Sequence, residues 1–117
     1  MFAYLREFGR RCEWARETRA LDLSGMGLAS ATLPKEVTDM TSLTELSLSQ
    51  NQLTGVAPDV LNMTNLTEID ISENQTMQEL APELGVMPKL QLLITDETPI
   101  TSPPQEVNLF FFILCLY

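Results

Sequence analysis

The residues of this chain with the greatest chemical potential are acidic and polar side chains that alternate with apolar ones in four short segments. They are Asp22, Ser24, Glu45, Ser47, Ser49, Gln50, Glu68, Asp70, Ser72, Glu73, Asp96 and Glu97. Seven are acidic and none is basic. Alternation points successive side chains to opposite faces of a strand, so we expect this set on one exposed face.

Two explanations of this acidic row remain open. A solvated face is one, because any strand must expose something. A binding face for a basic ligand is the other, because acids aligned on neighbouring strands repel one another and cost stability. Leu92 and Ile94 take the same outward positions in the fourth segment. Exposed apolar residues beside an acidic strip form the mixed patch that protein partners use.

Other chemistries have little support in the sequence. The chain has no histidine, which removes catalysis and metal sites that rely on imidazole. It has no Asp-x-Asp-x-Asp-Gly loop for calcium and no glycine-rich phosphate loop. Its acids lie along one open ridge instead of across a cleft. We therefore expect no enzyme, no metal site and no cofactor.

Charge narrows the class of partner. The 117 residues make one domain, and the formal net charge is −9. Residues 1–19 hold five Arg against three Glu, so the remainder, with two Lys against thirteen acids, carries −11. Nucleic acid and anionic membranes are poor partners for such a body, and a basic protein surface is a better one.

Cysteine usage bears on the compartment. Cys12 and Cys115 lie near opposite ends of the chain, so we expect two free thiols and a reducing, cytoplasmic location. Residues 1–20 are charged and amphipathic, unlike a signal peptide. The alternative, an extracellular protein, draws on three Asn-x-Thr sequons at Asn62, Asn65 and Asn74.

A repeat positions the acidic row. In residues 43–53, apolar residues occupy positions 1, 4, 6 and 11 and Asn51 occupies position 9. The pattern recurs from Leu66 with Asn74 at position 9. Weaker copies begin at Thr18 and Leu90, so the steps are 25, 23 and 24 residues. One unit cannot bury its apolar face alone, and stacked units form a continuous core.

The repeat also predicts a buried asparagine ladder. Asn51 and Asn74 should point inward and donate hydrogen bonds to backbone carbonyls of the next coil, because a buried amide must be hydrogen-bonded. Met26 and Thr98 take position 9 in the outer units.

Residues 2–16 read as an amphipathic helix at the N-terminus. The apolar stripe consists of Phe2, Leu5, Phe8, Cys12 and Ala15. The helix is expected to cap the first coil, with Trp14 packed on that coil; a basic helix that binds a partner is the competing interpretation.

Each predicted strand is followed by a return segment that contains proline, at residues 33–37, 57–61, 81–84 and 103–107. Proline suits the first turn of a helix, so each segment predicts a short helix on the convex side. Met40, Met63, Met87 and Leu109 should anchor these segments in the core.

The last residues differ in composition from the rest. An apolar run covers residues 109–117, too short to span a membrane as a helix. By register, Phe112 would begin a fifth strand. A truncated or misread C-terminus and a surface buried by self-association or by a membrane are the two hypotheses.

The residues from Leu43 to Leu53 resemble a leucine-rich repeat. The resemblance covers about residues 18–107. The return segments resemble those of the typical 23–24-residue class, which includes plant intracellular Ras-group-related and scribble-like proteins. Leu53-Thr54-Gly55-Val56-Ala57-Pro58 also resembles the Leu-x-Gly-x-Ile-Pro of plant receptor ectodomains.

The resemblance implies an α/β solenoid: a right-handed horseshoe with a parallel sheet on the concave face and short helices on the convex face. We expect a capping helix at 1–17, about four repeats at 18–107 and an apolar tail at 108–117. It implies a signalling scaffold that binds a protein through the acidic concave face. The alternative is a regulatory segment of a larger signalling enzyme or receptor.

Overall fold

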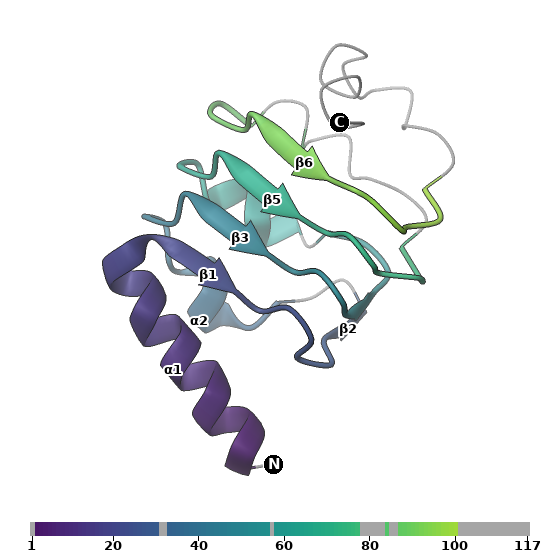
Figure 1. Cartoon of the computed structure of the whole chain (residues 1–117). Helices are drawn as coiled ribbons and strands as arrows, with labels where there is room; N and C mark the ends of the chain where they lie inside the picture. Colours follow the sequence, from purple (N-terminus) through teal and green to yellow (C-terminus); the bar gives the residue numbers. More distant parts are fainter. Residues whose placement is uncertain (1, 31–32, 57, 78–83, 85–86, 101–117) are drawn as a thin grey trace.

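A computed structural model of the chain describes residues 2–30, 33–56, 58–77, 84 and 87–100. One long helix precedes short strands that alternate with return segments (Figure 1). In chain order the elements are α1 (Phe2–Thr18), β1 (Ala20–Asp22), β2 (Ala29–Ser30), α2 (Lys35–Thr38), β3 (Glu45–Ser47), β4 (Gln52–Leu53), the 3₁₀ helix η1 (Pro58–Asn62), β5 (Glu68–Asp70) and β6 (Leu92–Ile94).

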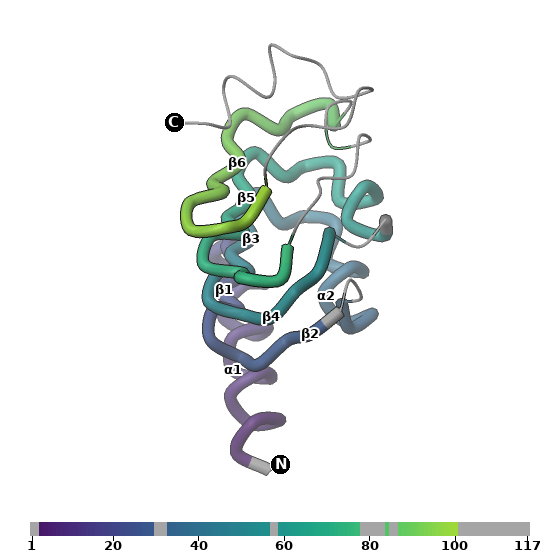
Figure 2. Tube along the Cα trace, turned by 90° about the vertical axis from the view of Figure 1, so that its right-hand side faces the viewer, coloured from purple at the N-terminus to yellow at the C-terminus, as the bar shows by residue number. Residues whose placement is uncertain are grey.

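The main sheet contains one strand from each repeat. Its order is β1-β3-β5-β6, and every pair is parallel. Position 4 of each repeat aligns across the sheet, from Leu21 through Leu46 and Ile69 to Leu93. The predicted repeat and its register are therefore confirmed, and the sheet lies on the opposite side of the molecule from α2 and η1 (Figure 2).

The core fills the space behind this sheet. Leu21, Leu46, Ile69 and Leu93 are at most 2% exposed, and position 6 adds Leu23, Leu48 and Ile71 at 0–1%. Burial of each such side chain contributes roughly 1.5–3 kcal/mol. The return segments close the other side with Val37, Val60 and Met63, each fully buried. The core is thus one continuous column that no single repeat could form.

Asn51 and Asn74 form the predicted buried ladder, with one difference. The Asn51 Nδ2 group donates to the carbonyl of Leu23 at 3.0 Å, and its Oδ1 atom accepts from the N–H groups of Met26 and Leu28. Asn74 likewise donates to the carbonyl of Leu48. Both amides therefore bind backbone groups of the preceding coil, not of the next one.

Position 8 of each repeat adopts a left-handed backbone. Gly25 has φ 65°, and Gln50, Glu73 and Glu97 each have φ 57°. This conformation turns the chain away from the main sheet after each strand. In the first two coils the turn leads into a second parallel sheet, in which β2 pairs with β4.

The return segments are helical where the structure describes them. α2 is a four-residue helix with Pro34 at its N-cap, and η1 is a 3₁₀ helix that begins at Pro58, so of these two described segments the first is α-helical and the second is not. Met63 and Met87 are buried as predicted, whereas Met40 is half-buried against the core. Most of the third segment and all of the fourth, including Leu109, lie outside the described residues.

α1 extends two residues beyond the predicted end and packs on β1. Cys12 and Ala15 are buried and Phe8 is half-buried against the core, as the apolar stripe predicted. Leu5 is 56% exposed, because the first part of the helix projects past the sheet (Figure 1), so its placement in the stripe was wrong. Trp14 is 70% exposed, so the prediction that it packs on the first coil was also wrong.

The predicted fifth strand and the apolar tail at 109–117, with Cys115, lie outside the described residues. Within the residues that the structure describes, none of the helices combines the length and apolar character needed to cross a membrane.

Candidate functional site

The outward positions of the main sheet form two rows of side chains. The first row, at position 3, runs Ala20, Glu45, Glu68, Leu92. The second row, at position 5, runs Asp22, Ser47, Asp70, Ile94. We call these eight residues the open face. Adjacent strands lie about 4.8 Å apart, so neighbours within a row can share one ligand.

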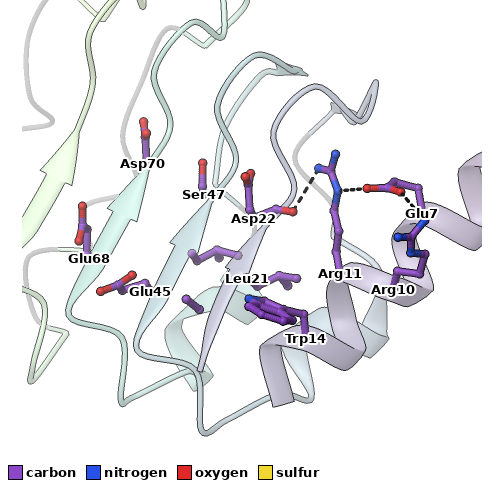
Figure 3. Close-up of a pocket in the computed structure, with 12 residues that line it drawn as sticks. Glu7, Arg10, Arg11, Trp14, Leu21, Asp22, Glu45, Ser47, Glu68 and Asp70 are labelled. Carbon is purple, nitrogen blue, oxygen red and sulfur yellow. Dashed lines mark hydrogen bonds and ion pairs between the residues drawn. The ribbon is translucent and has the colours of Figure 1, made fainter. Parts of the chain in front are cut away.

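A groove lies between α1 and the open face (Figure 3). Its volume is about 680 Å³. Glu7, Arg10, Arg11 and Trp14 line it on the helix side, and Glu45, Glu68 and Asp70 are among the sheet residues that line the other side. The acidic row was predicted to lie on an open ridge, and α1 turns the β1 end of that ridge into a groove.

Arg11 is fixed at one side of this groove. Its Nη1 atom donates to the carbonyls of Asp22 at 3.2 Å and Ser24 at 2.9 Å, and its Nε atom donates to Glu7 Oε1 at 2.9 Å. The hydrogen bond from Arg11, together with the charges of Arg11 and Arg10, lowers the pKa of Glu7 despite some desolvation. Arg11 therefore holds α1 to the end of β1, beside Asp22 of the second row.

The two aspartates of the second row are engaged locally. Asp22 Oδ1 accepts the N–H of Ser24 at 2.9 Å, and Asp70 Oδ1 accepts the N–H of Ser72 at 2.9 Å and its hydroxyl at 2.6 Å. Burial raises the pKa of Asp22, but the hydrogen bonds from Ser24 and the charge of Arg11 outweigh it, so the net shift is downward. These aspartates shape the turn after each strand.

Two serines predicted on the exposed face lie elsewhere. Ser49 and Ser72, at position 7, are each 9% exposed. The alternation holds only as far as the strand does, and β3 ends at Ser47. The chain then turns inward, so the prediction that these serines face outward was wrong.

The remaining predicted residues lie beyond the strand ends. Gln50, Glu73, Asp96 and Glu97 are exposed. Gln50 Nε2 donates to Glu73 Oε2 at 3.0 Å, and Gln75 Nε2 donates to the carbonyl of Glu97. None of them lines the groove beside α1. They form a separate polar edge.

Leu92 and Ile94 lie in register with the acids, as predicted, but are half-buried instead of exposed. Each keeps part of its side chain at the surface of the face. The open face therefore changes from acidic on β3 and β5 to apolar at β6.

Trp14, Arg10 and Arg11 were missing from the predicted site. The repeat period gives no information about how α1 is docked. Only a helical-wheel comparison could have identified Trp14 as a candidate site residue. It lies off the stripe of Phe8, Cys12 and Ala15, and the chain contains no other tryptophan.

Among the described residues, no three His, Cys, Asp or Glu side chains come together as metal ligands would.

The three sequons differ in environment. Asn74 is fully buried, Asn65 donates to the carbonyl of Thr41, and Asn62 is exposed.

Comparison with known proteins supports the repeat. The sequence family described as Leucine Rich repeats (2 copies) matches residues 41–84, which include β3, β4, η1 and β5. No curated protein matches the sequence. Taken with the four-stranded parallel sheet and its N-terminal helix, the match identifies leucine-rich repeats in this chain and its fold as a small leucine-rich-repeat solenoid.

Proposed function

We propose that the protein is a non-enzymatic scaffold for protein–protein interaction, and that its open face binds a partner with a basic surface. Leucine-rich repeats in general bind proteins, which gives the class of function. The specific face is our proposal. The observation that carries it is the alignment of Glu45 beside Glu68 on neighbouring strands.

Like charges placed directly opposite each other destabilise a sheet. In the part of the chain that the structure describes, the ion pairs join Glu7 to Arg10 and Arg11, and neither Glu45 nor Glu68 takes part in one. A basic partner would relieve this repulsion and would also associate faster at low salt. Leu92 and Ile94 would supply apolar contact at the far end of the same face.

We also propose a cytoplasmic location. Cys12 is a buried free cysteine. Burial raises the pKa of its thiol, which makes the thiol less reactive. Unpaired buried cysteines suit a reducing compartment. Expression with a secretory leader tests the extracellular alternative: efficient secretion with a glycan on the exposed Asn62 would contradict our assignment.

Affinity capture from lysate, with salt dependence, tests the binding face. The variant Glu45→Lys/Glu68→Lys/Asp70→Lys should lose the partners that the wild type captures. Glu13→Lys/Glu17→Lys/Glu36→Lys makes the same change in net charge at exposed positions outside the groove and should keep them. Circular dichroism verifies that both variants fold. Unchanged capture by the first variant would show that the open face is not the binding surface.

A further inference from the structure

Trp14 is the most exposed large apolar side chain among the described residues. Its side chain is 70% exposed although it lies on a helix whose neighbouring residues Cys12 and Ala15 are buried. Figure 3 shows the indole among the side chains that line the groove. Tryptophan is enriched among the residues that contribute most of the binding energy at protein interfaces.

The residues next to Trp14 define the chemistry of that molecule. Ala20 lines the groove together with Trp14, and it pairs in register with Glu45, which pairs with Glu68. Alanine leaves the space over β1 unfilled. An indole and two carboxylates therefore line the same groove.

Arg11 does not neutralise these carboxylates. Its guanidinium is bound to Glu7 and to the carbonyls of Asp22 and Ser24, all on the side of the second row. Among the described residues, neither Glu45 nor Glu68 of the first row forms an ion pair. A cation entering the groove would be attracted to these carboxylates and repelled from Arg11.

We propose that this groove binds an arginine side chain from a basic segment of the partner. The guanidinium stacks on Trp14 while its N–H groups donate to Glu45 and, further along the row, to Glu68. This proposal rests on the proposed function and adds the residue type that the groove selects.

Arginine fits this groove better than lysine for two reasons. Its planar guanidinium stacks on an aromatic face and still presents N–H groups at its edge to carboxylates. The lysine ammonium is a compact, strongly hydrated charge, which makes stacking and pairing together less favourable. The same face should therefore discriminate between two peptides of equal charge.

Because Trp14 is the only tryptophan, its fluorescence reports on the groove directly. The full chain is titrated with a short arginine-rich peptide, acetylated and amidated, and with its lysine and glutamine counterparts. We expect saturable quenching with the arginine peptide, binding about 3- to 10-fold weaker with the lysine peptide, and none with the glutamine peptide. Equal binding of the arginine and lysine peptides would overturn the proposal.

Variants locate the site, and calorimetry replaces fluorescence for Trp14→Leu. Trp14→Leu and Glu45→Gln/Glu68→Gln should each weaken the arginine peptide about 10-fold. The matched control Glu13→Gln/Glu17→Gln, on the same helix region but outside the groove, should bind as the wild type does. Undiminished binding by folded Trp14→Leu would overturn the proposal.

The two proposals fail in different ways. If charge reversal of the open face abolishes partner capture but the wild type binds no arginine peptide, the arginine site is wrong and the binding face stands. If charge reversal leaves capture unchanged, the proposed function is wrong whatever the peptides do.

Discussion

The two faces of the same four strands follow different rules. At position 4, Leu21, Leu46, Ile69 and Leu93 face inward, and the side chains are interchangeable in chemistry. One residue earlier in each strand, the outward position changes from Ala20 to Glu45, Glu68 and Leu92. The inner face is uniform because each coil must pack on the next. The outer face varies along the sheet, which is where a ligand can be recognised.

The largest effect should come from the buried asparagine ladder. Asn51→Ala leaves the N–H groups of Met26 and Leu28 without their acceptor inside the core. Each buried unsatisfied group costs about 1–3 kcal/mol, so we expect a loss of roughly 4 kcal/mol in the free energy of unfolding. Urea denaturation followed by circular dichroism measures it. The neighbouring exposed Gln52→Ala is the control and should change stability by less than about 0.5 kcal/mol.

The comparison of the two faces is sharpest at β5. Ile69 is fully buried, so Ile69→Ala should destabilise the fold by about 3 kcal/mol. Glu68→Ala, one residue away on the outer face, should change stability by no more than about 0.5 kcal/mol. The same denaturation experiment compares them. Similar losses of stability in the two variants would show that the outer face also stabilises the fold.

The sequence predicted these two faces unequally well. Position 4 could be assigned because the same packing between coils recurs in every repeat, so apolar residues recur in the sequence at a regular spacing. Ser49 was misplaced because alternation in sequence does not show that β3 stops at Ser47. Trp14 was misplaced because the angle at which α1 meets β1 depends on Phe8, Cys12 and Ala15 together. The acidic residues were found, whereas the groove that adjoins them was not.

A smaller effect, of opposite sign, tests whether the outer face is optimised for stability. Glu45→Lys places a cation beside Glu68 in register. Replacing repulsion by attraction in a cross-strand pair should stabilise the protein by about 0.5 kcal/mol at low salt. High salt screens exposed charges, so the gain should disappear there. A loss of stability at both salt concentrations would indicate that Glu45 has a structural role.

An effect no larger than that of Glu45→Lys concerns Asp22, where the faces meet α1. Its pKa is lowered in the folded protein, so its carboxylate contributes stability above the ordinary value of 3.8, and the contribution is lost as the pH falls through the folded value. Asp22 is largely exposed, which limits the contribution to about 0.5 kcal/mol. Between pH 5 and about pH 3, we expect the free energy of unfolding to fall by about 0.5 kcal/mol more in the wild type than in Asp22→Asn.

Asn is the suitable replacement because its Oδ1 atom can still accept the N–H of Ser24, so the turn after β1 keeps its shape. Other carboxyls, including Glu7, titrate in both proteins and cancel in the difference. If the difference vanished in high salt, the charge of Arg11 would be its main source. If it persisted, the hydrogen bonds from Ser24 would dominate, because they are screened far less than the attraction between exposed charges.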